Sequence, residues 1–240
     1  MDFQKVFKRI EKKYVLSEET YNQLYEKLKN YVTSDKYGQS TICNIYFDTP
    51  NRRLIRTSIE KPIYKEKLRM RSYGVPDDDA RVFVELKKKY NSVVYKRRIG
   101  MTLKQAKVFT STGLNIIENR QIENEIKYLF KLYPGLKPSM YISYERTAFY
   151  SIDNPDLRIT FDSNVIYRED NLELERGIGG TELLQHGQRI MEIKIPGSMP
   201  LWLTNMLTEL KIYPTSFSKY GMAYLRTLNQ KKKDMVINYD

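Results

Sequence analysis

Charged and apolar residues alternate in several short stretches of this chain. The clearest is segment 65–71, which reads KEKLRMR and places a cation at every second position, with mostly apolar residues between. Because side chains of a strand point alternately to its two faces, this segment predicts a strand with one cationic and one largely apolar face. Segments 81–87, 157–162 and 191–195 show similar alternation. The sequence therefore predicts a sheet that directs its cations to one side.

The spacing of apolar residues predicts about eight strands, most of them joined as antiparallel hairpins. We expect strands near residues 5–15, 40–48, 62–74, 80–90, 92–100, 138–150, 156–167 and 188–195. Helices are expected from Ser17, the predicted N-cap, and near 102–110, 118–132, 200–210 and 217–229. This mixture favours the α+β class, and eight antiparallel strands can close into a tunnel-like barrel with a charged lumen, flanked by the helices.

No repeat or low-complexity linker divides the chain. We therefore expect a single domain over residues 1–240, with 231–240 as a flexible tail. A Gly-rich, irregular insert is expected at about 170–187. Its segment 177–180, which reads GIGG, does not fit the phosphate-loop pattern and is interpreted as a flexible lid or a turn.

The period of two also separates the charged residues of each strand from the apolar ones. A solvated sheet face is the ordinary explanation for one such strand, but here cations outnumber carboxylates on the charged faces, and like charges opposite each other are destabilising. A bound polyphosphate or triphosphate with a divalent metal would offset that repulsion. The inward carboxylates Glu11, Glu85 and Glu192 are candidate ion-pair partners and ligands for Mg²⁺ or Mn²⁺.

Composition narrows the possible partners and sites. The net charge of +12 indicates an anionic partner such as nucleic acid, phosphate compounds or an acidic membrane. The single cysteine, Cys43, is expected to be a buried apolar residue, and the single histidine, His186, a loop residue, which excludes zinc sites built on Cys and His. The N-terminus has no apolar segment typical of a secretory signal, and no apolar run approaches 18 residues. We therefore expect a soluble, cytoplasmic chain, unless it is a fragment of a membrane protein, and the sequence leaves a membrane partner open.

Eight short motifs in register resemble one known family. They are RIEKKY at 9–14, YFDT at 46–49, KLRMRSYG at 67–74, VELK at 84–87, YERTAF at 144–149, RITFD at 158–162, MEIK at 191–194 and FSKY at 217–220. Together they resemble the VTC (vacuolar transporter chaperone) catalytic domain, the polyphosphate polymerase of the triphosphate tunnel metalloenzymes. The resemblance covers nearly the whole chain and implies a tunnel walled by antiparallel strands.

The resemblance and the strand parity together give the expected site. The resemblance implies that basic residues hold phosphates, that Tyr144 and Ser218 make further phosphate contacts, and that Glu192 binds the metal. Parity adds Arg9, Lys67, Arg98 and Lys194 to the charged faces. We assign catalytic roles to Lys13, Arg69, Arg71, Lys87, Arg146 and Arg158, phosphate binding to Arg9, Lys67, Lys96, Arg98, Tyr144, Lys194, Ser218 and Lys219, and metal binding to Glu192, with Glu11 and Glu85 as further candidates.

The expected activity is metal-dependent transfer of the terminal phosphoryl group of ATP to a growing polyphosphate chain. Hydrolytic relatives typically begin with E-x-E-x-K, whereas this chain has Arg9 in the first acidic position, which favours the polymerase. The alternatives are a metal-dependent triphosphatase on the same fold and a non-catalytic binder of polyphosphate or RNA. The aromatic residues form no recognisable RNA-recognition motif, so nucleic acid is not the expected partner.

Overall fold

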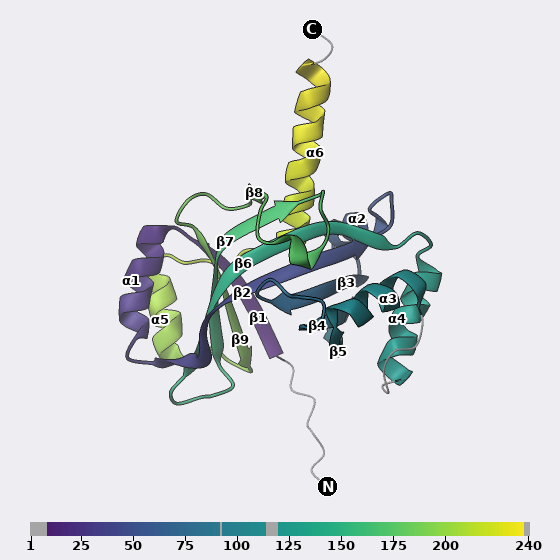
Figure 1. Ribbon diagram of the computed structural model, residues 1–240. Coiled ribbons are helices and arrows are strands. Elements are labelled where there is room, and N and C mark those ends of the chain that lie inside the picture. The colour runs from purple at the N-terminus through teal and green to yellow at the C-terminus, as the bar shows by residue number, and fades with distance from the viewer. Residues whose placement is uncertain (1–8, 92, 114–119, 238–240) are drawn as a thin grey trace. The chain divides into compact units, whose positions relative to one another are not determined.

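The computed structural model describes residues 9–91, 93–113 and 120–237 (Figure 1). The chain divides into two compact units, each assembled from segments that are distant in sequence. Unit 1 contains residues 1–41, 144–165 and 184–217, and unit 2 contains 42–143, 166–183 and 218–240. Each unit is described separately below.

The predicted α+β class with an antiparallel sheet is confirmed, and the described residues form nine strands in place of the expected eight. The hydrogen-bonded order is β1-β9-β7-β6-β2-β3-β4-β5, and β8 pairs with β7. The additional strand is the two-residue β8 (Thr181–Glu182), which lies in the segment expected to be irregular. Among the described residues this order has two ends, β1 and β5, so hydrogen bonding does not close the sheet into a barrel.

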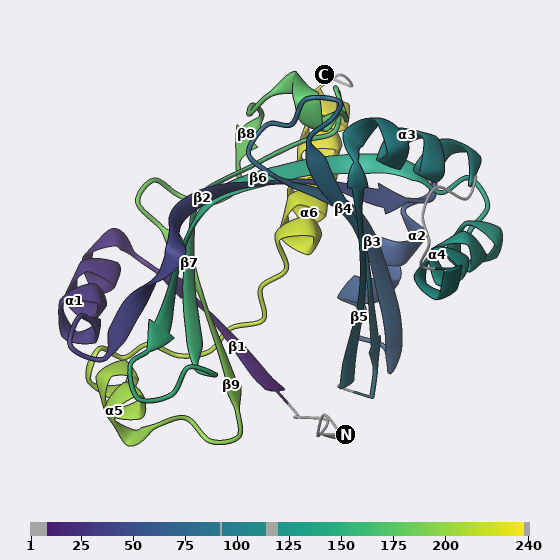
Figure 2. The same ribbon diagram turned by 60° about the horizontal axis from the view of Figure 1, so that its bottom comes forward.

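Unit 1 packs two helices against one side of its strands. The strands are β1 (Arg9–Leu16), β9 (Arg189–Pro196) and parts of β7 (Arg158–Arg168), β6 (Lys137–Ser151) and β2 (Val32–Asp48). Helices α1 (Glu18–Leu28) and α5 (Leu201–Glu209) lie side by side (Figure 2). Apolar residues of both helices, including Leu24 and Leu203, share one buried core with Ile193 of β9.

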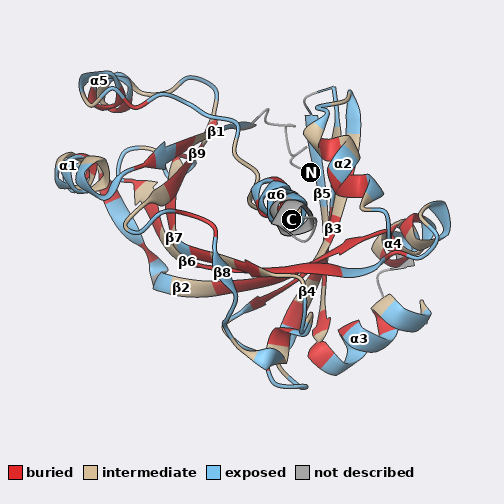
Figure 3. Cartoon of the chain, turned by 90° about the horizontal axis from the view of Figure 1, so that it is seen from above, coloured by how far each residue is buried: buried red, intermediate tan, exposed pale blue. Residues whose placement is uncertain are grey.

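Unit 2 is built around the antiparallel strands β3 (Tyr64–Tyr73), β4 (Arg81–Tyr90) and β5 (Val93–Thr102). Their apolar side packs against α3 (Leu103–Thr112) and α4 (Arg120–Leu132), and Figure 3 shows the buried positions along these strands. The unit also contains α2 (Arg53–Ile59), the 3-10 turn η1 (Leu174–Arg176) and α6 (Lys219–Ile237). The core includes Leu68, Val84 and Ile99, one from each of the three strands.

Local signals in the sequence explain several element boundaries. The Ser17 hydroxyl accepts a hydrogen bond from the Thr20 backbone N–H at 3.1 Å, which confirms Ser17 as the N-cap of α1. Helix α3 begins with a capping box between Thr102 and Gln105. Cys43 is buried, and His186 lies in a turn, as expected. No helix in the described part of the chain is long and apolar enough to cross a membrane.

Three elements differ from the sequence prediction. Strand β2 begins at Val32 rather than near residue 40, and α6 continues to Ile237, through much of the segment expected to be a tail. Helix α2 was not predicted, because its first turn depends on a residue outside the helix. The buried carboxylate of Asp48 accepts hydrogen bonds from the backbone N–H groups of Leu54 at 2.9 Å and Ile55 at 3.0 Å.

The first part of the insert at 170–187 is bound by the side chain of Arg168. The Arg168 guanidinium donates hydrogen bonds to four main-chain carbonyls, those of Asn171, Glu173, Gly177 and Gly179, at 2.9–3.2 Å. It also lies 3.6 Å from the centre of the Tyr141 ring, a cation–π contact. Gly177 has φ +80°, a conformation that favours glycine. This part of the insert is an ordered turn.

Candidate functional site

One side of the β2–β5 strands in unit 2 carries the predicted cations, and we call this side the basic face. These residues lie on the face that strand parity predicted. The strand register then aligns them in rows across the sheet. Arg69 lies opposite Tyr46 and Glu85, and Glu85 lies opposite Arg98. In the next row toward the β4–β5 turn, Lys67, Lys87 and Lys96 are direct neighbours on three strands. Like charges on adjacent strands repel each other, so this row adds to the anion-attracting character of the basic face.

Glu85 gathers four cations of the basic face around one buried carboxylate. Its oxygens lie 2.6 Å from Arg69, 2.9 Å from Lys96, 3.4 Å from Arg98 and 3.9 Å from Arg71. Burial alone would raise the pKa of Glu85, but Arg69, Arg71 and Lys96 lower it to about 2. The carboxylate is therefore ionised at neutral pH and orders these side chains. In this structure Glu85 serves as the shared ion-pair partner of these cations.

Two residues of β2, Asn44 and Tyr46, accept hydrogen bonds from the arginines of the basic face. The side-chain amide oxygen of Asn44 accepts a hydrogen bond from Arg71 Nε at 2.9 Å, and its amide nitrogen donates to the Ile142 carbonyl at 3.0 Å. Arg69 donates to the Tyr46 hydroxyl at 3.2 Å. Burial raises the pKa of Tyr46, but the nearby Arg69, Arg71 and Lys67 lower it to about 8. The sequence interpretation missed both residues, although the same parity rule applied to 43–48 would have found them.

Helix α6 brings its first residues to the basic face. The Ser218 hydroxyl accepts a hydrogen bond from Lys67 Nζ at 3.0 Å, and Lys219 begins the helix. The Tyr220 ring stacks on Tyr46 with centroids 4.7 Å apart, and its hydroxyl donates to Asp48 at 2.8 Å. Free backbone N–H groups at a helix start favour anions. Ser218 and Lys219, expected from the family resemblance alone, therefore join the residues that parity identified.

Unit 1 contains a second set of ion pairs, which we call the Glu192 cluster. Glu192 of β9 lies 2.5 Å from Lys194 and 3.6 Å from Lys13, and Lys13 lies 3.2 Å from Glu11. Burial would raise the pKa of Glu192, but Lys194, Lys13 and Arg146 hold it well below its usual range. The strand register explains the arrangement, because Lys13 lies opposite Glu192 and Glu11 lies opposite Lys194.

Two further predicted arginines of unit 1 are each anchored by an aspartate. Arg146 donates two hydrogen bonds to Asp162, at 2.6 and 2.7 Å, a bidentate geometry. Arg158 donates to Asp35 at 3.0 Å. Tyr144 is buried, and the Arg146 guanidinium lies 5.2 Å from the centre of its ring. Asp35 was missed because the first half of β2 was not predicted as a strand.

The carboxylates of the Glu192 cluster fit a metal ion whose other ligands are substrate phosphates and water. Glu11 and Glu192 come from neighbouring strands and approach the same Lys13 amine. Among the described residues, no group of three or more His, Cys, Asp or Glu side chains is placed to hold a metal ion. Mg²⁺ commonly uses one or two carboxylates together with substrate phosphates and water. The donor set is compatible with that kind of site.

All predicted site residues with described side chains fall into one of these two groups. Lys67, Arg69, Arg71, Lys87, Lys96, Arg98, Ser218 and Lys219 belong to unit 2, and Lys13, Tyr144, Arg146, Arg158, Glu192 and Lys194 belong to unit 1. The Arg9 side chain lies outside the described residues, although its backbone pairs with Pro196. Arg71 is more enclosed than expected, with its side chain only 8% exposed.

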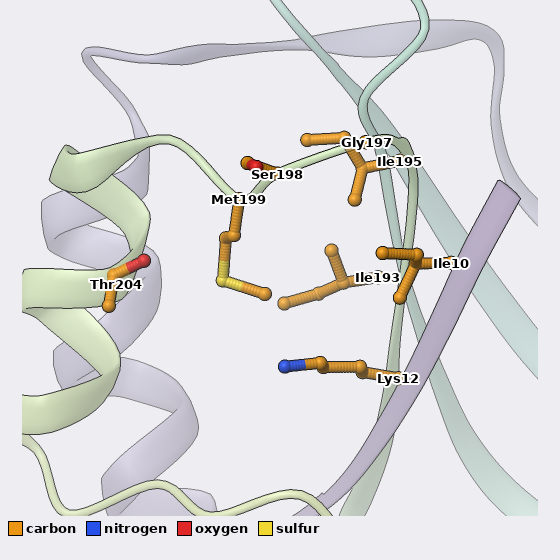
Figure 4. Close-up of a pocket in the computed structure, with 8 residues that line it drawn as sticks. All are labelled: Ile10, Lys12, Ile193, Ile195, Gly197, Ser198, Met199 and Thr204. Carbon is orange, nitrogen blue, oxygen red and sulfur yellow. The ribbon is translucent and has the colours of Figure 1, made fainter. Parts of the chain in front are cut away.

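A separate cavity lies on the opposite side of β1 and β9 from the Glu192 cluster. It has a volume of about 520 Å³ and mainly apolar walls, formed by residues that include Ile10, Ile193 and Met199. The Lys12 amine extends into it (Figure 4). Because neighbouring strand residues point to opposite faces, this cavity is distinct from the predicted site.

The fold defines an α+β protein with an antiparallel sheet, and each of its two units carries a cluster of ordered cations. Three solved structures share this fold. A candidate adenylate cyclase from Bacillus halodurans aligns with a TM-score of 0.56 at 16% identity, over 88% of this chain and 93% of its own. A candidate adenylate cyclase from Vibrio parahaemolyticus aligns with a TM-score of 0.51 at 12% identity, over 91% of this chain and 98% of its own. A candidate adenylyl cyclase from Hippeastrum, described as having a dominant triphosphatase activity, aligns with a TM-score of 0.56 at 15% identity, over 91% of this chain and 95% of its own.

The sequence itself identifies the family. The profile of the VTC domain matches residues 8–228, so the chain belongs to the VTC domain family. This confirms the resemblance seen in the eight short motifs. A comparison with curated protein sequences gave no match.

Proposed function

We propose that this protein is a metal-dependent polyphosphate polymerase that uses ATP. The observation that carries the proposal is the row of Lys67, Lys87 and Lys96 across three adjacent strands, beside the arginines ordered by Glu85. The row and the arginines give the basic face an excess of positive charge, which a chain of phosphates can match at regular spacing. Membership of the VTC domain family supports the same substrate class.

The reaction needs positioning and charge neutralisation more than acid–base chemistry. A terminal phosphate oxygen of the polyphosphate attacks the γ-phosphorus of ATP. The bond from that phosphorus to the β–γ bridging oxygen breaks, and ADP leaves with the electron pair, so the chain gains one phosphate. Arg69 and Arg71 grip phosphate oxygens, and Asn44 and Tyr46 keep their guanidinium groups oriented.

The Glu192 cluster of unit 1 has its own role in the proposal. Glu192 and Glu11 would hold the divalent metal, Mn²⁺ or Mg²⁺, which would neutralise charge on the phosphates when bound. Lys13, Lys194, Arg146 and Arg158 bind phosphate oxygens around it. Asp162 and Asp35 fix the two arginines, so that little side-chain freedom is lost when phosphate binds.

One observation favours a second candidate function. The Hippeastrum protein, which has the same fold, is described as having a dominant triphosphatase activity. A triphosphatase would use the same cations but transfer the phosphoryl group to water. In the sequence, Arg9 in place of the first acidic residue of hydrolytic relatives favours the polymerase, since it removes one possible metal ligand.

The deciding experiment is incubation of the purified protein with ATP and Mn²⁺, with the products examined by gel electrophoresis and phosphorus NMR. The polymerase gives long chains with internal phosphate signals. Orthophosphate alone, especially from tripolyphosphate, would assign the triphosphatase instead. Lys87→Gln should lower chain synthesis strongly without unfolding the protein, because Lys87 is exposed, whereas Lys104→Gln on α3 is the control with the same charge change.

A further inference from the structure

The basic face continues beyond the residues assigned above. One row further toward the β4–β5 turn, Lys65 lies directly opposite Lys89. Because residues two apart in a strand share a face, both lie on the same side as Lys67 and Lys87. A third lysine, Lys61, lies in the turn that precedes β3, and a backbone hydrogen bond of 3.0 Å from Asn91 N–H to the Ile63 carbonyl joins this turn to the end of the hairpin.

These three lysines differ from their neighbours in having no acidic partner. Lys88 pairs with Glu125 and Lys96 with Glu85, whereas no carboxylate in the described part of the chain forms an ion pair with Lys61, Lys65 or Lys89. Burial, with Lys89 and Lys61 nearby, lowers the pKa of Lys65. Like charges placed directly opposite each other destabilise a sheet. This end of the basic face therefore has the electrostatic character of an anion site.

The length of the basic face exceeds what ATP requires. Arg71 and Lys65 are six residues apart along β3, which corresponds to about 20 Å in a strand. A triphosphate is shorter than this distance, whereas a polyphosphate chain can contact each successive row. The cations also change in type, from arginine at Arg71 and Arg69 to lysine at Lys67 and Lys65. Arginine fixes phosphate in a bidentate geometry, whereas lysine acts as a mobile point charge.

We propose that Lys61, Lys65 and Lys89 form a second phosphate subsite that holds the polyphosphate chain away from the reacting phosphate. The proposal rests on the polymerase function. The arginine end positions the reacting group, and the lysine end retains the chain while allowing it to move by one phosphate after each transfer. Retention at this subsite favours repeated additions to one chain over release of short products.

The test compares binding of long-chain polyphosphate and of tripolyphosphate to the full chain, without ATP, by calorimetry at several salt concentrations. Lys65→Gln/Lys89→Gln should weaken long-chain binding about tenfold and reduce the slope of its salt dependence by about two. Binding of tripolyphosphate should not change. The control Lys104→Gln/Lys131→Gln makes the same change in net charge on α3 and α4 and should leave both ligands unaffected.

Each outcome decides for or against the subsite. Equal weakening for both ligands would place these lysines at the reaction site and overturn the proposal, as would unchanged long-chain binding. If the double variant does not fold, Lys61→Gln alone, at an exposed position, should still weaken long-chain binding about threefold. A wild type that binds both lengths equally refutes the subsite. A wild type that prefers long chains but makes none refutes the polymerase and leaves the subsite supported.

Discussion

Replacing Glu85 with Gln removes the buried charge that orders the basic face. The pKa of Glu85 falls from its ordinary 4.5 to about 2 in the folded protein. By linkage, a shift of this size corresponds to about 3 kcal/mol of stability at neutral pH, which agrees with the roughly 3–5 kcal/mol measured when one partner of a buried ion pair is removed. We therefore expect Glu85→Gln to lose about 3 kcal/mol in the free energy of unfolding at pH 7.

The stability difference between the wild type and Glu85→Gln should depend on pH in a defined direction. A carboxylate with a lowered pKa stabilises the folded state above its unfolded pKa, and this contribution disappears as the pH falls through the folded pKa. The difference between the wild type and Glu85→Gln should therefore be complete above pH 4.5 and shrink toward pH 2. Added polyphosphate should further change the stability of both proteins, because it supplies negative charge to the same cations.

Urea unfolding followed by circular dichroism measures these differences. Glu125→Gln is the matched control, because Glu125 also bridges two cations, Lys88 at 3.6 Å and Arg97 at 3.1 Å, but its side chain is 25% exposed. Such a pair contributes less than about 1 kcal/mol. Equal stability of Glu85→Gln and the wild type at pH 7 would refute the idea that Glu85 organises the basic face.

Three further predictions concern residues around the two clusters. Tyr46→Phe should abolish an ultraviolet tyrosinate signal that appears in the wild type near pH 8. Because the pKa of Tyr46 is lowered in the folded state, its ionisation should also stabilise the wild type relative to this variant as the pH rises from 8 to 10. Asn44→Ala should lower turnover more than ATP affinity and cost about 1–3 kcal/mol of stability, because it frees Arg71 and leaves the buried Ile142 carbonyl without its partner; equal kinetics would show that Arg71 does not need this support. Glu192→Gln should lose Mn²⁺-stimulated activity while still binding tripolyphosphate, and full stimulation would exclude Glu192 as the metal ligand.

Strand parity predicted which face of each strand carries the candidate site residues, because parity depends only on local geometry. The alternation at 65–71 survives in β3, where Lys67 and Arg69 lie on one face and the buried Leu68 on the other. The register that brings Arg69 opposite Glu85 depends on strand pairing, which a single segment does not encode. The sequence could therefore name the cations and candidate carboxylates but not decide which carboxylate would serve which cations.

The residues that the sequence missed act over long separations. Asp48 begins helix α2 through backbone groups six and seven residues away and also accepts a hydrogen bond from Tyr220, near the other end of the chain. Asp35 lies in a part of β2 that reads VTSDKYGQ from residue 32, with few apolar residues to mark a strand. In both cases tertiary contacts, rather than local periodicity, determine the structure.

The guanidinium of Arg168, which binds four carbonyls of the insert, also predicts how this segment can vary in sequence. Arg168 recognises carbonyl oxygens, which every residue carries, so the identity of the side chains at 171, 173 and 179 matters little to these four hydrogen bonds. Mutational tolerance should therefore be high at exposed positions such as Glu173 and Gly179 and low at Arg168. A library of variants covering 168–180 would show intolerant positions at Arg168, at Leu174, which is buried in the core, and at Gly180, whose backbone conformation and close approach to the Tyr167 carbonyl leave no room for a side chain.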